Sequence, residues 1–208
     1  MPTRNGLTRV DRVKSPAKQH RSQESRKAVV EAAIDLGSNQ GYDRTRTREI
    51  AQAAYMSEGG MFRHFHSKAD LFADAFEVAA EDMVEQFAGP MTDCVRTKEV
   101  GQFESLIRSL LTDRRMRLVI DVLSASQFDE ELAERLKPMI ERVDALLVDA
   151  VATAGEDLPA HSGEFLAEVQ RVFEQLVGRL ILGQAMGRPI DTDPVIGDLA
   201  AQLLKFAR

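Results

Sequence analysis

Apolar residues recur at intervals of three and four along most of this 208-residue chain, which is the spacing of one face of an α-helix. No stretch alternates apolar and polar residues as a half-buried strand does. The periodic segments cover residues 26–36, 67–89, 99–112, 114–127, 129–154, 162–187 and 194–207. With two short helices between residues 45 and 66, we expect an all-α protein of about nine helices.

Capping residues and helix breakers set the expected limits of the longer helices. Ser22 or Ser25 opens the first helix. Ser67 opens a long helix, because its hydroxyl can accept a backbone N–H of the first turn, and Gly89-Pro90 is expected to end it.

The helix expected over residues 129–154 carries two informative residues of its own. Asp129 suits the N-cap position, where a carboxylate accepts a free backbone N–H. Pro138 lies inside the helix and removes one N–H, which predicts a kink. Kinked helices are one way to open a cavity, and they are also common in closed bundles.

A distinctive pattern lies between residues 41 and 71, in the segment GYDRTRTREIAQAAYMSEGGMFRHFHSKADL. It predicts two short helices joined by a tight turn. Thr45 or Thr47 can cap the first helix and Ser57 the second, because each hydroxyl can accept an unpaired backbone N–H. This arrangement is typical of a helix-turn-helix, in which one helix supports and the next lies in the DNA major groove.

The same segment resembles the N-terminal signature of the tetracycline-repressor (TetR) family of one-component transcriptional regulators. The resemblance covers roughly residues 24–75 and includes RKAVVEAAIDL, which is similar to the family's first helix. It implies an N-terminal three-helix helix-turn-helix DNA-binding domain followed by a C-terminal helical ligand-binding and dimerisation bundle. The positions that match in order and spacing are Thr45, Ile50, Ala51, Ala54, Ser57, Gly59, Phe62, His64, Phe65, Ser67 and Lys68.

The resemblance also implies a division of the chain and a set of DNA contacts. We expect a basic disordered arm over residues 1–22, a DNA-binding domain over residues 23–68 and a ligand-binding and dimerisation domain over residues 69–208. The family's DNA-contact positions correspond to Arg46, Thr47, Arg48, Ser57, Glu58, Gly59, Gly60, Phe62, Arg63, His64 and Lys68.

Several positions depart from the family pattern. Phe62 stands where the family usually has a tyrosine whose hydroxyl bonds a phosphate. The pair Gly59-Gly60 either lets the backbone approach DNA closely or leaves a locally frayed helix. Gly37 replaces a large aromatic residue, and Tyr55 replaces a turn glycine. We hypothesise that the Tyr55 ring fills the volume vacated at Gly37.

Net charge changes sign along the chain, which as a whole carries a formal charge of -6. Residues 1–72 contain 13 Lys and Arg against 8 Asp and Glu, whereas residues 73–208 contain 14 against 25. Basic charge is therefore concentrated around the helix-turn-helix, as attraction to phosphates requires. The basic arm is either a solvated tail or an extension that reaches along phosphates or into a minor groove.

Other classes of site receive little support. Cys94 is the only cysteine, so no intrachain disulfide is expected, and no segment approaches the length of a membrane span. We therefore expect a cytoplasmic protein with no membrane contact. His64 and His66 are two residues apart, whereas paired helical metal ligands need three or four, so we expect no metal and no cofactor. No catalytic arrangement or glycine-rich phosphate loop stands out, which argues against an enzyme.

The helical body supplies candidate residues for an effector pocket and for a homodimer interface. Such residues more often fill a core than line a pocket. The pocket candidates are Met83, Phe87, Phe103, Ile107, Met116, Ile120, Leu123, Phe128, Met139 and Phe173. The last two helices have broad apolar faces that can form a four-helix interface with a second copy, through Phe165, Val169, Val172, Leu176, Leu180, Ile196, Leu199 and Leu203.

Together these features predict a dimeric, sequence-specific DNA-binding transcriptional regulator. We expect a repressor that a small apolar or amphipathic effector of unknown identity releases from a palindromic double-stranded DNA operator. An alternative with the same fold is an activator, or a nucleoid-type DNA binder that responds to no ligand. A remote alternative is a helical enzyme.

Overall fold

The computed structural model describes residues 16–154, 162–186 and 196–197. In these ranges the all-α prediction is confirmed, because the structure contains helices and loops and no strand. The expected helix over residues 194–207 lies outside the described residues, apart from helical residues 196 and 197. The helices are α1 (Pro16–Gln40), α2 (Thr47–Ala53), α3 (Glu58–Met61), α4 (Lys68–Thr97), α5 (Val100–Thr112), α6 (Arg114–Ala125), α7 (Glu130–Ala154) and α8 (Ser162–Ala185).

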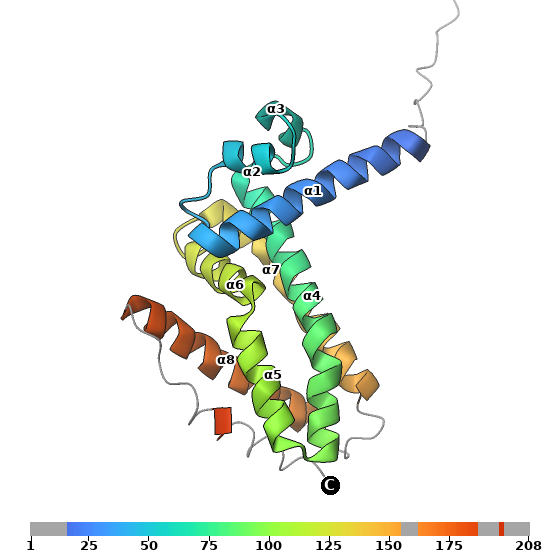
Figure 1. Cartoon of the computed structure of the whole chain (residues 1–208), viewed down its shortest axis with the longest axis vertical. Helices are drawn as coiled ribbons and strands as arrows, with labels where there is room; N and C mark the ends of the chain where they lie inside the picture. Colours follow the sequence, from blue (N-terminus) through green and yellow to red (C-terminus); the bar gives the residue numbers. More distant parts are fainter. Residues whose placement is uncertain (1–15, 155–161, 187–195, 198–208) are drawn as a thin grey trace, which may run out of the picture.

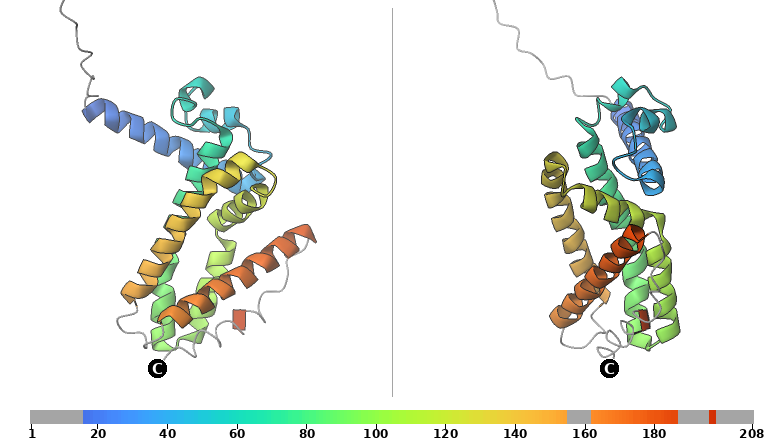
Figure 2. Two further views of the ribbon diagram at one scale, coloured as in Figure 1. Left: turned by 180° about the vertical axis from the view of Figure 1, so that it is seen from behind. Right: turned by 90° about the vertical axis from the view of Figure 1, so that its left-hand side faces the viewer.

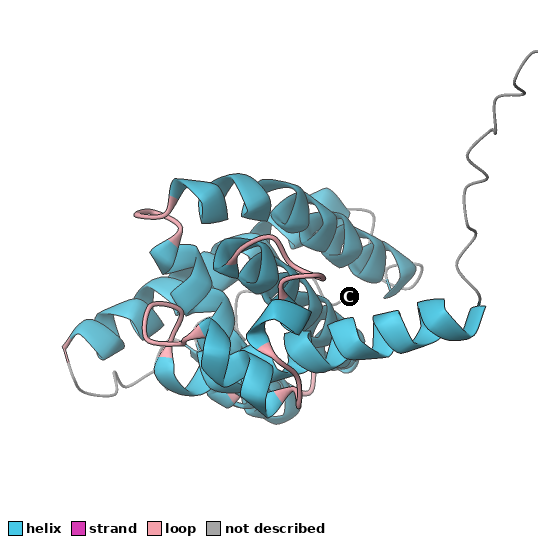
Figure 3. Ribbon diagram, turned by 90° about the horizontal axis from the view of Figure 1, so that it is seen from above, coloured by secondary structure: helices cyan, strands magenta, loops and turns pink. Residues whose placement is uncertain are grey.

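Helix α4 is the axis of the molecule (Figure 1). Helices α1 to α3, here called the head, lie at one end of α4, and α5, α7 and α8 extend toward the other end, as both views of Figure 2 show. We call α5 to α8 the body. Helix α4 packs against α1 in the head and against α5, α6 and α7 in the body. Seen from above in Figure 3, the N-terminal part of α1 projects past the other helices.

The apolar stripe predicted along α4 forms the core of both regions. Helix α4 therefore couples the head to the body through one continuous apolar cluster, which also includes residues of α1, α2, α6 and α7. Its buried members on α4 are Ala69, Leu71, Phe72, Ala73, Ala75, Phe76, Ala79, Ala80, Met83 and Phe87.

Most of the helix starts predicted from the sequence are confirmed by cap contacts. The Ser67 hydroxyl accepts the Asp70 backbone N–H at 3.0 Å, and the Asp70 carboxylate accepts the His66 N–H at 2.8 Å. Asp129 caps α7 by accepting the Leu132 N–H at 3.0 Å. Each of these bonds satisfies a donor that the helix itself cannot.

The end predicted for α4 at Gly89-Pro90 is wrong, because the helix continues through Pro90 to Thr97. Proline normally clashes with the Cβ of the residue before it, and Gly89 has no Cβ. Cys94 in the extra two turns is 3% exposed, so packing holds this part of the helix in place. The same burial raises the pKa of the Cys94 thiol, which makes it a poor redox sensor.

The predicted start of the first helix at Ser22 or Ser25 is also wrong. Helix α1 begins at Pro16, and proline suits a first turn because its missing N–H would have no helical partner. Residues 16–22, which the sequence assigned to a disordered arm, are therefore helical. The rest of the expected arm, residues 1–15, lies outside the described residues.

The proposed exchange of volume between Gly37 and Tyr55 is wrong. A Cβ atom on Gly37 would lie 2.6 Å from Leu118 Cδ1 and 2.8 Å from Phe72 Cε1, so these two side chains already fill the space. Tyr55 is 98% exposed and has φ +55°. It therefore occupies the left-handed turn position that favours glycine, and its ring does not enter the core.

Gly37→Ala should destabilise the protein by about 1–3 kcal/mol, because the added methyl overlaps Leu118 and the buried Phe72 ring. The clash should outweigh a gain of about 1 kcal/mol in helix propensity. Chemical denaturation measures the effect. Gly101→Ala in α5 is the control, because a Cβ atom at residue 101 would meet nothing within 4 Å. The free energy of unfolding of this variant should not fall. An equal free energy of unfolding in the two variants would contradict the close packing at Gly37.

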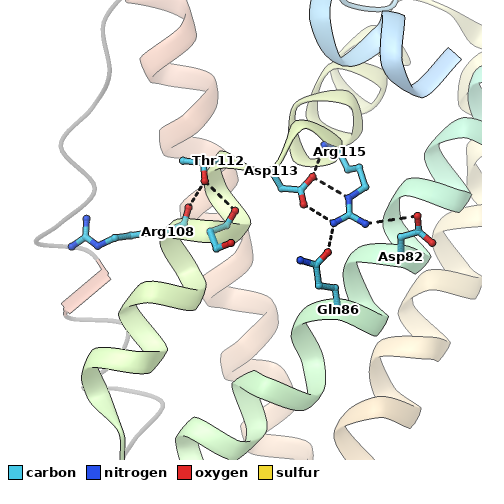
Figure 4. A network of polar contacts seen from close by, with 7 residues as sticks. Asp82, Gln86, Arg108, Thr112, Asp113 and Arg115 are labelled. Carbon is cyan, nitrogen blue, oxygen red and sulfur yellow. Dashed lines mark hydrogen bonds and ion pairs between the residues drawn. The ribbon is translucent and has the colours of Figure 1, made fainter. Parts of the chain in front are cut away.

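A polar network joins the start of α6 to α4 (Figure 4). The Arg115 guanidinium donates two hydrogen bonds to Asp113, at 3.0 Å and 2.5 Å, and it also bonds Gln86 and lies 3.7 Å from Asp82. Asp113 in turn caps α6 by accepting the Arg115 backbone N–H at 2.8 Å. Hydrogen bonds from Arg115 hold the pKa of Asp113 below its ordinary value. These contacts of the Arg115 guanidinium therefore fix the junction between α5 and α6 against α4.

Asp113→Asn should keep the helix cap and lose the ion pair, which should cost roughly 1–2 kcal/mol at pH 7. Because the folded pKa of Asp113 is depressed, its contribution is present above about pH 4 and is lost as the pH falls through the folded pKa. The free energy of unfolding should therefore drop less between pH 7 and pH 3 in the variant than in the wild type. Asp93→Asn, at an exposed pair within α4, should leave this drop nearly unchanged. If Asp113→Asn lost as much free energy of unfolding between pH 7 and pH 3 as the wild type does, the stabilising role of ionised Asp113 would be contradicted.

Candidate nucleic-acid interface

Helices α2 and α3 form the predicted helix-turn-helix at one end of the molecule (Figure 1). Helix α2 begins after Arg46, whose backbone N–H donates to Glu49 Oε2 at 3.3 Å. The expected capping role of Thr45 is wrong, because Thr45 is buried and its hydroxyl donates to the Gly41 carbonyl at 2.6 Å. Arg46 thus occupies the N-cap position, where its exposed side chain is placed beside the free N–H groups of α2.

Helix α3 is a single turn, shorter than the sequence suggested. Its cap is the predicted one, since the Ser57 hydroxyl accepts the Gly60 N–H at 3.1 Å. The backbone is helical across Gly59 and Gly60, and the chain turns again after Met61. Two adjacent glycines disfavour a longer helix, and a Cβ on Gly59 would meet nothing within 4 Å. The glycine pair therefore leaves the tip of α3 with bare backbone that DNA can approach closely.

The structure brings the candidate DNA-binding residues together on the head. The side chains of Arg46, Arg48, Ser57, Glu58, Phe62 and Arg63 are exposed, as is Gly59. Those of Thr47, His64 and Lys68 are half-buried, as is Gly60. Two arginines at the start of α2 and one beyond α3 thus present guanidinium groups to solvent around the α3 tip, as a phosphate-binding surface requires.

A hydrogen bond between two candidate residues links the starts of α2 and α3. The Thr47 hydroxyl donates to the Glu58 carboxylate at 2.5 Å. This contact gives Glu58 a structural role, because it holds the two helix starts together. Helical periodicity cannot reveal the pair, since the two residues belong to different helices.

Lys68 is held against the aromatic core of the head. Its ammonium lies 4.3 Å from the centre of the Tyr42 ring and 3.4 Å from the Asp43 carbonyl oxygen. Burial lowers the pKa of Lys68, while nearby carboxylates, first Asp43, oppose that shift. The lysine is therefore already oriented at the start of α4, and this cation–π contact was not apparent from the sequence.

Predicted effector-pocket residues fall into four groups. Phe128 does not line an interior cavity, because it is 93% exposed in the turn between α6 and α7, so this part of the expectation is wrong. Leu123 and Met139 are half-buried. The side chain of Phe173 lies outside the described residues. The buried members are Met83, Phe87, Phe103, Ile107, Met116 and Ile120.

A cleft of about 960 Å³ lies between α1, α4 and the start of α6, at the junction of head and body. It is lined largely by charged side chains, including Arg26, Asp35 and Arg114, and the last two form an ion pair across it. None of the predicted pocket residues lines this cleft. An effector pocket among them remains a prediction.

The dimer-interface candidates are described only in part. Ile196 is fully buried within its own chain, so it is not available to a partner, and this part of the expectation is wrong. The side chains of Phe165, Val169, Val172, Leu176, Leu180, Leu199 and Leu203 lie outside the described residues. Two other apolar side chains of α8, Ile181 and Leu182, are nevertheless exposed, as is Met186 directly after the helix ends.

The described ranges also bear on metal sites and on membrane spans. Residues 16–154, 162–186 and 196–197 contain no cluster of His, Cys, Asp or Glu side chains suited to a metal ion. Among the helices described there, none is long and apolar enough to span a membrane.

Comparison with known proteins gives a family match that lies mainly in the head. The family model described as "Bacterial regulatory proteins, tetR family" matches residues 29–75, which run from α1 through α3 into α4. The chain is 29% identical over 109 residues to the HTH-type transcriptional regulator AcrR of Shigella flexneri. That match covers 49% of this chain and 49% of AcrR, so the chain spans about half the length of this relative.

Longer matches extend into the body. The nucleoid occlusion factor SlmA of Aliivibrio fischeri is 25% identical over 189 residues, covering 91% of this chain and 83% of SlmA. The structure of NalD from Pseudomonas aeruginosa, titled as the secondary repressor of the MexAB-OprM multidrug efflux pump, superposes with a TM-score of 0.53. It covers 88% of this chain and 97% of NalD at 17% identity, a likeness of fold.

Arg46→Ala should weaken DNA binding by a similar factor on all sequences, because we expect this exposed residue to contact phosphate and not a base. The slope of log affinity against log salt concentration should become shallower by about one. Fluorescence anisotropy at several salt concentrations measures both effects. Lys137→Ala, which removes an exposed cation from α7, is the control and should change neither. If Arg46→Ala binds as the wild type does, Arg46 is not part of the interface.

Proposed function

We propose that this chain, a DNA-binding transcriptional regulator of the bacterial TetR family, is a homodimeric repressor released from a palindromic operator by a small apolar or amphipathic effector. In this proposal residues 23–68 form the DNA-binding domain and residues 69–208 form the effector-binding and dimerisation domain. Helix α4 begins at the boundary and extends into the second domain. A motion of α4 would therefore reach the head directly.

The observation that carries the proposal is the exposed group of arginines around the α3 tip. Arg46, Arg48 and Arg63 are exposed at the head, and residues 1–72 have an excess of basic side chains. The remainder of the chain has an excess of acidic side chains. Such a distribution favours an approach to DNA with the head first, because the acidic body is repelled by phosphates.

The apolar surface at the C-terminal end of α8 supports a homodimer. Ile181, Leu182 and Met186 are 41%, 56% and 54% exposed in the single chain, and they lie close together in sequence at the C-terminal end of α8. Helices that expose such a surface commonly pair with a second copy about a twofold axis. Two heads related by that axis would read two inverted half-sites, which is why we expect a palindromic operator.

Effector control would act through differential affinity. A ligand that binds better to a body shape in which the two heads are wrongly spaced must weaken DNA binding by the same factor by which DNA weakens the ligand.

Selection of bound duplexes from a random DNA pool tests the proposal. We expect enrichment of two inverted half-sites with centres about 10 base pairs, or a multiple of that distance, apart. Sedimentation of the protein with the selected duplex should give two chains per site. Enrichment of single half-sites by a monomer, or no enrichment at low salt, would contradict it.

A second candidate is a DNA binder that needs no effector. The similarity to SlmA, which is named as a nucleoid occlusion factor, covers 91% of this chain and supports a nucleoid-type DNA binder. The two candidates can be separated by measuring the melting temperature of the protein with a panel of small molecules and with a cell extract. An effector-controlled repressor should be stabilised by at least one component, and that component should release the selected DNA. Stabilisation by DNA alone would favour the second candidate.

A further inference from the structure

Tyr42, in the loop between α1 and α2, is bound by carboxylates from two helices of the body. Its backbone N–H donates to Asp121 Oδ2 on α6 at 2.5 Å. Its phenol hydroxyl donates to Asp129 Oδ2, just before α7, at 2.6 Å. One residue of the head is thus fixed at both its backbone and the tip of its side chain.

The surroundings of Tyr42 make both bonds specific. The residue is 5% exposed, its ring meets Phe72 of α4 edge to face with centres 5.0 Å apart, and Lys68 lies over the ring. Burial raises the pKa of Tyr42, and the hydroxyl bond to Asp129 raises it further. The same bond is the largest cause of the lowered pKa of Asp129. A hydrogen bond to an ionised carboxylate is about twice as strong as one between neutral groups.

The loop leaves little space for the head to shift while these bonds persist. Gly41 has φ +83°, and a Cβ there would lie 3.1 Å from both carboxylate oxygens of Asp121. The Asp121 carboxylate therefore sits directly against the backbone of the loop. Asp129 also accepts the first-turn N–H of Leu132, so a displacement of α7 would pull on the Tyr42 hydroxyl.

We propose that Tyr42 is a positioning residue, whose bonds to Asp121 and Asp129 hold the DNA-reading head at one angle to the body. The inference rests on the proposed function, because the angle matters only if two heads must match two half-sites. Changing the half-site separation by one base pair moves a half-site by about 3.4 Å along the duplex. A head that is held at one angle should lose much of its affinity for DNA when the spacing changes, whereas a head that is free to turn should lose little.

Tyr42→Phe isolates the hydroxyl bond. It keeps the ring that packs on Phe72 and Lys68, and it leaves the Asp129 cap of α7 in place. The matched control is Thr45→Val. It removes another buried hydroxyl of the same loop, whose bond goes to Gly41 inside the head and never reaches the body.

The first measurement is affinity for the selected operator and for duplexes with one base pair added to or removed from the spacer. The wild type should prefer the original spacing by roughly tenfold or more, the equivalent of one charge-assisted hydrogen bond. Tyr42→Phe should reduce that preference to roughly threefold or less. Thr45→Val should keep the full preference even if its melting temperature falls as much. A full preference in Tyr42→Phe, or a loss in both variants, would overturn the inference.

The second measurement needs no DNA. Amide hydrogen exchange should become roughly tenfold faster in Tyr42→Phe at both sides of the contact, residues 41–45 and the first turn of α7. In Thr45→Val faster exchange should stay within the loop of the head. If the wild type binds no palindromic DNA while this pattern holds, the proposed function fails and the link between head and body stands. Unchanged exchange at α7 in Tyr42→Phe would remove the link itself.

Discussion

Burial of one face of α4 between the head and the body is the interaction on which the rest of the structure depends. Leu71, Phe72 and Phe76 are at most 4% exposed and belong to the cluster that joins the head to the body. Each such side chain contributes on the order of 1.5–3 kcal/mol, whereas an exposed ion pair contributes about 0–1 kcal/mol. Pairs such as Arg114–Asp35, with both side chains more than half exposed, therefore add little to stability.

Polar contacts in this molecule mainly fix how its helices and loops are oriented relative to one another. The Arg115 guanidinium fixes the junction between α5 and α6 against α4. The carboxylates of Asp121 and Asp129 fix the loop between α1 and α2 against α6 and the start of α7. Apolar packing alone permits helices to slide or rotate slightly, while a hydrogen bond to a charged group has a narrow geometry. The orientation of the reading surface thus depends on a few partly or fully buried polar side chains.

Local signals in the sequence were sufficient for most of the fold. Helical spacing placed α5, α6, α7 and α8, and the caps at Ser57, Ser67 and Asp129 were readable because each acts within its own first turn. The start of α1 at Pro16 is a local signal that was missed, whereas the other failures concern tertiary context. Burial around Cys94 carries α4 past Pro90, and the space at Gly37 is filled by residues far away in the chain. The positions of the candidate site were predictable from the resemblance to the TetR family, whose signature lies in one short segment. The Thr47–Glu58 and Lys68–Tyr42 contacts were not, since no periodicity joins them.

The central claim is that two basic heads, held at a fixed angle, contact one face of a duplex. Hydroxyl-radical footprinting of the protein on a selected duplex tests it most directly, since cleavage of the backbone reports which sugars the protein covers. The account predicts two protected patches on each strand, about one helical turn of 10 base pairs apart or a multiple of it, on the same face of the DNA. Even protection along the duplex, or a single patch, would contradict it.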